Sequence, residues 1–274
     1  MSDRELPYDN YRNSHLHKGQ EYHDKFVNNS YRSIIWNIEQ RLLLDIIERH
    51  RQRRQKPIRL LDFACGTGRI LEVLENRLAE STGVDISDSM LAVARKHLSR
   101  SRLLHMDITR SGGLDGEIFD VISAFRFFPN AEPDLRRETM AQLAQLLEQD
   151  GILIANNHLR CGGSKLRLRT WLARLGVKQV QRKLHCMSDC EMLQLASANG
   201  LELHEQHFTA VMPIFKESRP LLTRFLLRWI EENVVDRAPI TPYANSTIYV
   251  FGRRQTLGSK QTRPYATHGT HDRQ

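Results

Sequence analysis

Hydrophobic and polar residues alternate along the chain with two different periods, and these periods predict where helices and strands lie. Between about Ser33 and Pro57, apolar side chains recur every three or four residues, which is typical of one face of a helix. After Pro57 the apolar residues gather into short continuous runs, as expected of strands that are buried on both faces. These runs predict strands at 58–64, 81–86, 102–108, 118–125 and 151–157.

Helical periodicity returns between the predicted strands, at 68–79, 87–98 and 133–148. Ser87 or Asp88 is expected to cap the second of these helices, since short polar side chains accept hydrogen bonds from the first backbone N–H groups of a helix. Strands that alternate with helices over short connections predict an α/β fold, in which a parallel sheet lies between two layers of helices.

The pattern changes after residue 157. Residues 159–187 contain eight lysines and arginines and no aspartate or glutamate, interleaved with leucines and a tryptophan, which predicts a basic amphipathic insertion. Ser188 and Glu191 then form a capping-box pattern at the start of a helix over 188–199. The remaining predicted elements are a strand at 201–211, a helix at 219–235 and a strand at 245–252.

The composition changes this picture little. Of 274 residues, 40% are hydrophobic and 26% are charged, as in ordinary globular proteins. No segment approaches about 18 consecutive uncharged apolar residues, so no membrane span is expected. The N-terminal segment lacks the apolar stretch of a secretory signal, so the simplest expectation is a cytoplasmic protein with free thiols. The four cysteines are Cys65, Cys161, Cys186 and Cys190.

The net charge of +8 is compatible with a nucleic acid, an acidic small molecule or a membrane surface as the partner. A nucleic-acid-binding protein usually carries a recognisable module, and the sequence contains no zinc-finger or RNA-recognition signature. The basic run between Arg49 and Lys56 ends the first predicted helix, where cations complement the helix dipole. We expect a solvated helix end there, with contact to a polyanion as the alternative.

A glycine-rich turn, DFACGTG, follows the first predicted strand. Its Gly66 and Gly68 lie at the carboxyl end of that strand, where open α/β sheets bind ligands. A dinucleotide fingerprint would need a third glycine where Leu71 stands, and a P-loop would need Lys and Ser or Thr where Arg69 and Ile70 stand. The turn therefore favours a close backbone approach to a group other than pyrophosphate.

Two aspartates end the next predicted strands. Asp85 can accept hydrogen bonds from both hydroxyl groups of a ribose. Asp107 ends the third strand, faces the same crevice and is suited to a base, with capping of a turn as the alternative role. Apolar walls for an adenine are available from Ile86, Met90 and Ile108. Together these residues predict a site for an adenosine that carries no pyrophosphate.

In this order, the segments DFACGTG, GVDIS, HMDIT, FDVISAF and GILIANN resemble the class I S-adenosylmethionine-dependent methyltransferases over residues 58–157. The glycine loop of that family often reads D/E-x-G-x-G-x-G, and Ala64 replaces its first glycine here. The resemblance implies that S-adenosyl-L-methionine is the cofactor and that its methionine part is bordered by Asp62, Ala64, Gly66 and Gly68. It also implies that Asp85 binds the ribose hydroxyls and that the adenine contacts Ile86, Asp107 and Ile108.

The same resemblance implies a Rossmann-like doubly wound sheet, mostly parallel with an antiparallel last strand. It divides the chain into an N-terminal lid segment and helix (1–57), a methyltransferase domain (58–253) and a disordered tail (254–274). Within the domain, 159–187 and 212–240 are expected to cap the substrate, although a helix with a solvated basic face is the alternative for the first. The sulfonium and the substrate are implied to face Ala124, Phe125 and Arg126.

Position alone suggests further residues on the acceptor side. His158, after the fifth strand, is a candidate general base, with an exposed loop histidine as the alternative. Asn156 and Asn157 beside it can hydrogen-bond a polar substrate, and Tyr22 and His23 lie in the segment that folds as a lid in many relatives. No metal is expected, because no standard zinc spacing links the available ligands, which are His158, Cys161, His185, Cys186 and Cys190.

The function expected first is methylation of O or N on a polar small molecule, acidic ones included, or on a glycan-like acceptor. An RNA methyltransferase is the alternative, favoured by the charge but disfavoured because the segment after the fourth strand, SAFRFFPN, lacks an N-P-P-Y-type motif that clamps a base. A third hypothesis is a non-catalytic module that binds the cofactor or serves as a scaffold. The sequence carries no signal of the oligomeric state.

Overall fold

The computed structural model of the chain describes residues 30–110, 114–176, 186–214, 222–235 and 239–254. The predicted lid residues Tyr22 and His23, the tail from residue 255 onward and His185 lie outside these ranges. In the described part of the chain, no helix is both long enough and apolar enough to cross a membrane.

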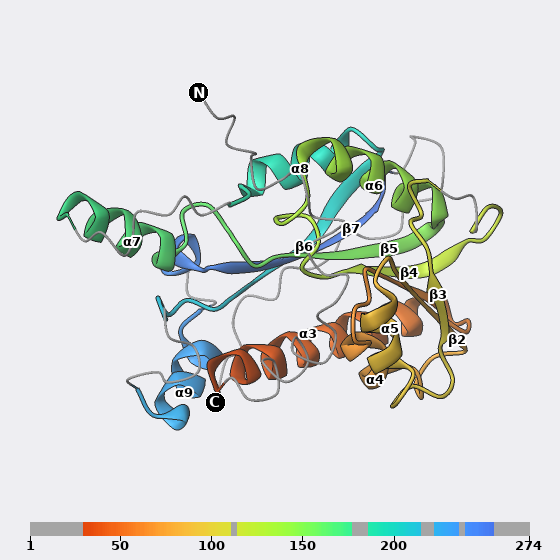
Figure 1. Cartoon of the computed structure of the whole chain (residues 1–274), viewed down its shortest axis with the longest axis horizontal. Coiled ribbons are helices and arrows are strands. Elements are labelled where there is room, and N and C mark those ends of the chain that lie inside the picture. The colour runs from red at the N-terminus through yellow and green to blue at the C-terminus, as the bar shows by residue number, and fades with distance from the viewer. Residues whose placement is uncertain (1–29, 111–113, 177–185, 215–221, 236–238, 255–274) are drawn as a thin grey trace.

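A seven-stranded sheet with the order β3-β2-β1-β4-β5-β7-β6 forms the centre of the molecule (Figure 1). Strands β1 to β5 pair in parallel, and β7 is antiparallel to both β5 and β6, which confirms the predicted sheet. The strands are β1 (Arg59–Phe63), β2 (Glu80–Asp85), β3 (Arg102–His105), β4 (Phe119–Ala124), β5 (Leu147–Asn157), β6 (Leu201–Thr209) and β7 (Ser246–Arg253).

Helices cover both faces of the sheet, with α3, α4 and α5 on one side and α6 and α8 on the other (Figure 1). Helix α7 projects from one end of the molecule, and α9 packs against α3. The helices are α3 (Ser30–Arg54), α4 (Arg69–Leu74), α5 (Asp88–Ala94), α6 (Pro133–Leu146), α7 (Ser164–Arg174), α8 (Asp189–Ser197) and α9 (Arg224–Asn233), with a short 3₁₀ helix at Thr241–Tyr243.

The apolar runs of the central strands supply two separate cores, because successive side chains of a strand point to opposite faces. In β5, Ile152 and Ile154 pack with α3, α4 and α5, whereas Leu153 and Ala155 pack with α6 and α8. All six residues of β4 are buried. The sheet is therefore held rigidly from both sides, and its carboxyl edge is a fixed platform for the loops that follow each strand.

Predicted caps and boundaries are largely confirmed. The Ser87 hydroxyl accepts a hydrogen bond from the Met90 N–H, and Ser188 and Glu191 form a complete capping box at the start of α8. Strand β5 begins earlier than predicted, at Leu147, because this residue pairs with Phe119 across a register shift. The preceding helix consequently ends at Leu146.

The expectation of four free thiols is wrong for one pair. Cys161 and Cys186 form a disulfide. A parallel bridge between Arg160 and Met187 brings the two cysteines to a Cα–Cα distance of 5.1 Å, within the range that a disulfide requires. Their separation of 25 residues gives no sign of this bridge in the sequence. Cys65, which is buried, and Cys190, which is exposed, are free.

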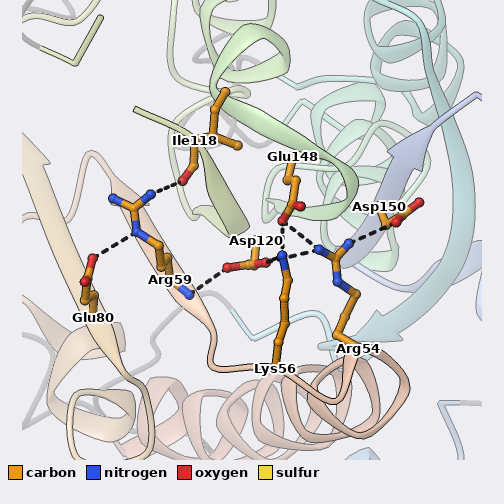
Figure 2. Close-up of polar contacts among 8 residues, drawn as sticks. All are labelled: Arg54, Lys56, Arg59, Glu80, Ile118, Asp120, Glu148 and Asp150. Atoms are coloured by element: carbon orange, nitrogen blue, oxygen red, sulfur yellow. Dashed lines mark hydrogen bonds and ion pairs between the residues drawn. The ribbon is translucent and has the colours of Figure 1, made fainter. Parts of the chain in front are cut away.

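The basic end of α3 is only partly the solvated helix end that its composition predicts, since Arg51 and Arg53 are exposed whereas Arg54 and Lys56 are paired (Figure 2). The Arg54 guanidinium lies 2.6 Å from Glu148, and the Lys56 ammonium lies 2.6 Å from Glu148 and 2.9 Å from Asp120. Asp120 also accepts a hydrogen bond from the backbone N–H of Arg59 at 2.9 Å. This part of the basic run closes the amino edge of the sheet, so it is occupied by the protein's own carboxylates.

Candidate functional site

A cavity of about 280 Å³ lies at the opposite, carboxyl edge of the sheet, beyond β1, β2 and β4. Open α/β sheets bind their ligands at this edge. Of the residues predicted from the sequence, those that line this cavity are Asp62, Ala64, Gly66, Asp85, Ile86, Met90, Asp107, Phe125, Arg126 and His158. Gly68, Ile108, Ala124 and Asn157 do not line it.

The two glycines of the loop have different structural roles. Gly66 has a φ of +55°, and a Cβ added there would have no atom within 4 Å. Gly68 has a φ of +79°, but its added Cβ would lie 2.6 Å from the Leu98 side chain. Gly66 thus leaves open space beside the cavity that it lines, whereas Gly68 allows the start of α4 to pack closely against the chain after α5.

Asp85 connects the glycine loop to the loop after β2. Its carboxylate accepts hydrogen bonds from the backbone N–H groups of Gly66 and Ser87, each at 2.8 Å. A carboxylate can accept about four hydrogen bonds, so a ribose diol can bind alongside these two donors. The same contacts hold the two loops at a fixed separation.

Asp62, near the end of β1, is the most deeply buried acid of the cavity, with 1% of its surface exposed. The Ser123 hydroxyl donates to Oδ1 at 2.6 Å, while Oδ2 is buried with no hydrogen-bond partner among the described residues. Burial raises the pKa of Asp62 to about 7, although Ser123 and the Arg69 charge lower it. A cationic group bound here would satisfy Oδ2, and the α-ammonium of S-adenosylmethionine is such a group.

Asp107 fixes a turn and also lines the cavity. Its Oδ1 accepts hydrogen bonds from the Thr109 N–H at 3.0 Å and the Thr109 hydroxyl at 2.7 Å, so it does fix a turn. It also lines the cavity together with Met106 and Thr109. Ile108 is buried in the core beneath, where it supports this wall from behind.

Arg126 follows β4 in a left-handed backbone conformation, with a φ of +62°. Such a conformation in a residue other than glycine is strained by on the order of 1–3 kcal/mol and is held by its surroundings. The buried Asn156 side chain holds it here, because Oδ1 accepts the Arg126 N–H at 2.6 Å. Asn157 instead donates to the Met187 carbonyl at 2.7 Å. It lines neither this cavity nor the second cavity described below.

A second cavity of about 250 Å³ adjoins the first and shares Arg32, Arg126 and His158 with it. Burial lowers the pKa of His158 well below its ordinary value, and the charges of Arg126 and Arg32 lower it further. The Nδ1 atom of His158 is buried without a hydrogen-bond partner in the described part of the chain. His158 is therefore a neutral imidazole at the boundary between the two cavities.

Comparison with known proteins agrees with this arrangement. A family model described as a methyltransferase domain matches residues 61–155, which run from β1 into β5. YqeM of Bacillus subtilis (strain 168), assigned to the methyltransferases, is 31% identical over 106 residues, which are 36% of this chain and 42% of that protein. The dTDP-3-amino-3,4,6-trideoxy-alpha-D-glucopyranose N,N-dimethyltransferase of Streptomyces venezuelae is 30% identical over 112 residues, 40% of this chain and 46% of that protein. The match thus spans less than half of each curated relative.

Among solved structures, magnesium protoporphyrin IX methyltransferase from Synechocystis PCC 6803 with bound SAH has the same fold. The TM-score is 0.57 at 13% sequence identity, and the match covers 87% of this chain and 96% of that one. Residues 61–155 thus match the methyltransferase-domain model, and the described chain has the fold of this solved methyltransferase.

The second cavity contains an acid that the sequence did not single out. Glu39, on α3, is 2% exposed, and its Oε1 lies 3.4 Å from the Ser246 hydroxyl. Burial raises its pKa, although the Arg126 and Arg69 charges lower it. The available signal was its position, four residues after Ile35 and four before Leu43, which places a carboxyl on the buried face of the helix.

Two arginines that line the first cavity were also missed. Arg32 and Arg69 both line the first cavity, and the Arg69 guanidinium lies over the Trp36 ring at 4.6 Å. Arg69 seemed from the sequence to be only a departure from a P-loop, and Arg32 belongs to the polar start of α3. Among the residues that the structure describes, which exclude His185, no group of three or more His, Cys, Asp or Glu could hold a metal.

Proposed function

We propose that this chain transfers a methyl group from S-adenosylmethionine to an O or N atom of a polar small molecule. The observation that carries the proposal is the pair of adjoining cavities, one with a buried, half-satisfied carboxylate at Asp62 and one on the far side of Arg126 and His158. A volume of about 250 Å³ suits a small acceptor rather than a polymer strand. The Streptomyces venezuelae relative, which acts on a nucleotide-linked amino sugar, supports the same class.

In this proposal the chain's own residues orient the reactants. Asp62 holds the ammonium and Asp85 the ribose hydroxyls, while Ile86 and Met90 flank the adenine and Asp107 accepts from its amino group. When bound, the cofactor supplies a methyl group on a cationic sulfur, which is already a good leaving group. The protein therefore acts mainly by alignment and exclusion of water.

His158 serves better in this proposal as a neutral hydrogen-bonding group than as a strong base. A general base is most effective when its pKa lies near the operating pH, and the pKa of His158 is lowered well below the ordinary value. An acceptor that is already deprotonated needs no base. His158 as the catalytic residue, with Phe125 and Arg126 facing the acceptor, stays a prediction.

RNA is the weaker candidate acceptor. From composition alone, Arg54 and Lys56 are candidates to contact a polyanion. In the structure they are paired with Glu148 and Asp120, on the edge of the sheet opposite the cavities. A polyanion could instead contact exposed basic residues such as Arg174 on α7. Binding to RNA should then fall steeply with salt concentration, whereas binding to a small acceptor should depend on salt only weakly.

Two measurements test the proposal. Calorimetry should show that the purified chain binds S-adenosylmethionine at one site. Labelled methyl groups should then pass from radiolabelled cofactor to the small-molecule fraction of a cell extract. Label found in RNA would show that RNA, rather than a polar small molecule, is the acceptor. Cofactor binding without label in any fraction would favour a non-catalytic module. Absence of cofactor binding would overturn the proposal itself.

A further inference from the structure

We infer that one end of the molecule docks on the surface of an anionic lipid membrane, with the aromatic side chains of α7 and α9 at the level of the lipid headgroups. The inference goes beyond the proposed function, because it concerns a surface and not the two cavities. Its test needs neither cofactor nor acceptor, so the inference and the proposed function can fail separately.

Exposed hydrophobic side chains gather on three elements of the chain. Among the described residues, eight large hydrophobic side chains are exposed, and six of them belong to α7, α9 and the 3₁₀ helix that follows α9. Helices α7 and α9 lie at the same end of the molecule's longest axis (Figure 1). Exposed hydrophobic residues that gather in this way, unlike single ones, indicate contact with a protein or a membrane. The six form what we call the apolar end: Trp171, Leu175, Phe225, Leu226, Trp229 and Tyr243.

Helix α7 projects from the body of the molecule, and none of its residues is buried (Figure 1). A helix of 11 residues is only marginally stable in water by itself, so it needs a surface to pack against. Trp171 and Leu175 are four residues apart and therefore share one face of the helix. Arg167 and Arg174 are also exposed and lie on the same face, four residues before and three residues after Trp171.

Helix α9 is anchored to the fold by one face and exposes aromatic side chains on the other. Its buried residues are Leu227 and Glu231, and Leu227 packs in a cluster with apolar residues of α3. Phe225 and Trp229 each lie two residues from Leu227, which places them about 200° around the helix, on the opposite side. Phe225 is 82% exposed, so nothing in the described chain covers this face.

Charge favours a membrane over a second copy of the chain as the occupant. Arg167 and Arg174 are the exposed cations of α7, and the helix contains no acid. Arg167 contacts the Gly162 carbonyl at 2.7 Å and the Tyr243 ring at 4.6 Å, neither of which carries an opposite charge. In a symmetric dimer the same surface meets itself, so the cations of one copy would lie near those of the other. A leaflet that contains anionic lipids attracts these cations instead.

The types of side chain at the apolar end also suit a membrane interface. Tryptophan and tyrosine are enriched at the level of the headgroups, because their rings have an apolar body and a polar atom. Amphipathic helices with tryptophan, phenylalanine and leucine on one face and basic residues beside them bind in the plane of the interface. The contact would be peripheral, since no helix in the described part of the chain could cross a membrane.

The apolar end adjoins the second cavity. Leu166 of α7 lines this cavity, and Leu227 of α9 packs with Tyr31 and Ile35, which line it as well. A membrane bound at the apolar end would therefore lie beside the proposed acceptor site.

Vesicle binding by the full chain tests the inference. Cosedimentation would compare vesicles of phosphatidylcholine with vesicles of phosphatidylcholine and phosphatidylglycerol in equal parts. The mixed vesicles should bind the chain at least about tenfold more tightly, because each cation near an anionic leaflet contributes about fivefold. Two of the three tryptophans belong to the apolar end, so the tryptophan emission should shift to shorter wavelength when the chain binds.

The double variant Trp171→Ser with Trp229→Ser is decisive, and it should weaken binding to the mixed vesicles at least about tenfold. Its matched control is Ile118→Ser with Leu203→Ser, which replaces the two large hydrophobic side chains that are exposed elsewhere among the described residues. The control should bind as the wild-type chain does. Circular dichroism would show whether both variants fold, and Phe225→Ser replaces the tryptophan variant if that variant does not.

A second pair of variants tests the contribution of charge. Arg174→Gln should weaken binding to the mixed vesicles about fivefold and leave binding to phosphatidylcholine vesicles unchanged. Arg100→Gln is the matched control, since Arg100 is an exposed cation between α5 and β3 and its replacement removes the same charge.

Three results would overturn the inference: no binding to either kind of vesicle, equal losses in the tryptophan variant and its control, or a dimer of the free chain that the tryptophan variant abolishes. Analytical ultracentrifugation would detect the dimer, which would assign the apolar end to a second copy of the chain. Each of these results leaves the proposed function standing.

Discussion

Two buried aspartates at opposite edges of the same sheet have pKa values shifted in opposite directions. Asp62, at the carboxyl edge, is 1% exposed and Asp120, at the amino edge, is 4% exposed. Burial raises the pKa of Asp62 to about 7, with one hydroxyl donor to offset it. Burial acts on Asp120 in the same direction, but hydrogen bonds with Glu148, the Arg59 N–H and Lys56 outweigh it and lower the pKa. Figure 2 shows the contacts of Asp120 with Arg59 and Lys56.

Both side chains are almost inaccessible to solvent, but the opposite shifts have two causes: Asp62 lies deeper in the protein and so loses more solvation, and the two carboxylates have different partners. At the amino edge the protein supplies its own cations, and the result is a closed network that contributes to stability. At the carboxyl edge a carboxylate oxygen is left buried without a partner, which is unfavourable unless a ligand supplies one. The charges at the amino edge therefore stabilise the fold, whereas the Asp62 carboxylate at the carboxyl edge is suited to bind a ligand. Mutations at the amino edge should accordingly change stability, and mutations at the carboxyl edge should change cofactor binding.

The largest effect is expected at the carboxyl edge. Asp85→Ala should weaken binding of S-adenosylmethionine about a hundredfold, because it removes the acceptor for two ribose hydroxyls and releases the Gly66 loop. Calorimetry would measure the loss. Asp88→Ala, an exposed aspartate on α5 that does not line the cavity, should bind normally. Unchanged affinity in Asp85→Ala would show that the cofactor site has been placed wrongly.

At the amino edge the effect should be on stability alone. Asp120→Ala removes the partner of the Arg59 N–H and one partner of Lys56, while Glu148 still binds Arg54 and Lys56. Urea denaturation should show a loss of about 2 kcal/mol in the free energy of unfolding. Affinity for the cofactor should not change. A large loss of affinity in this variant would contradict the separation of the two edges.

Asp62 should make cofactor binding depend on pH. Its raised pKa means that the folded protein without ligand holds a proton that the unfolded chain releases near pH 4, so this group's contribution to stability decreases as pH rises from about 4 to about 7. The bound ammonium favours the ionised carboxylate, so affinity should rise with pH up to about 7, by at most about tenfold per pH unit.

Calorimetry in two buffers of different ionisation enthalpy would detect the proton released on binding below pH 7. Asp62→Asn should remove both the proton release and the slope, and should bind the cofactor more weakly at pH 8. A pH-independent affinity in the wild-type chain would mean that Asp62 does not meet the ammonium.

Most of the fold could be predicted from the sequence, because local patterns determine it. The buried runs at Leu60 and Ile152 and the caps at Ser87 and Ser188 are signals within a few residues of the elements that they specify. That one cavity is lined by Gly66, Asp85 and Asp107 could be predicted for the same reason, since these residues follow successive strands and the carboxyl ends of parallel strands meet at one edge.

The rest depends on contacts between segments far apart in the sequence. Glu39 becomes an acceptor-side acid only because α3 crosses the sheet beside Ser246, and Cys161 meets Cys186 only because a β-bridge brings them together. The pairing of Arg54 and Lys56 at the end of α3 could not be predicted for the same reason. The carboxylate partners, Asp120 and Glu148, lie more than sixty residues away in the sequence.

The smallest predicted effect concerns backbone strain, which both edges contain. Ala64, in the cofactor loop, has a φ of +54°, and Gln55, after the last turn of α3, has a φ of +52°. Replacement of either by glycine should raise the free energy of unfolding by about 1 kcal/mol, because the left-handed strain exceeds the entropy that glycine adds to the unfolded chain. Gln55→Gly should leave cofactor binding unchanged, since an exposed helix end is all that it alters. Ala64→Gly should weaken binding by less than about threefold, because a more flexible loop must be ordered around the ligand. Equal binding in both variants would show that strain at the carboxyl edge is no more functional than strain at the amino edge.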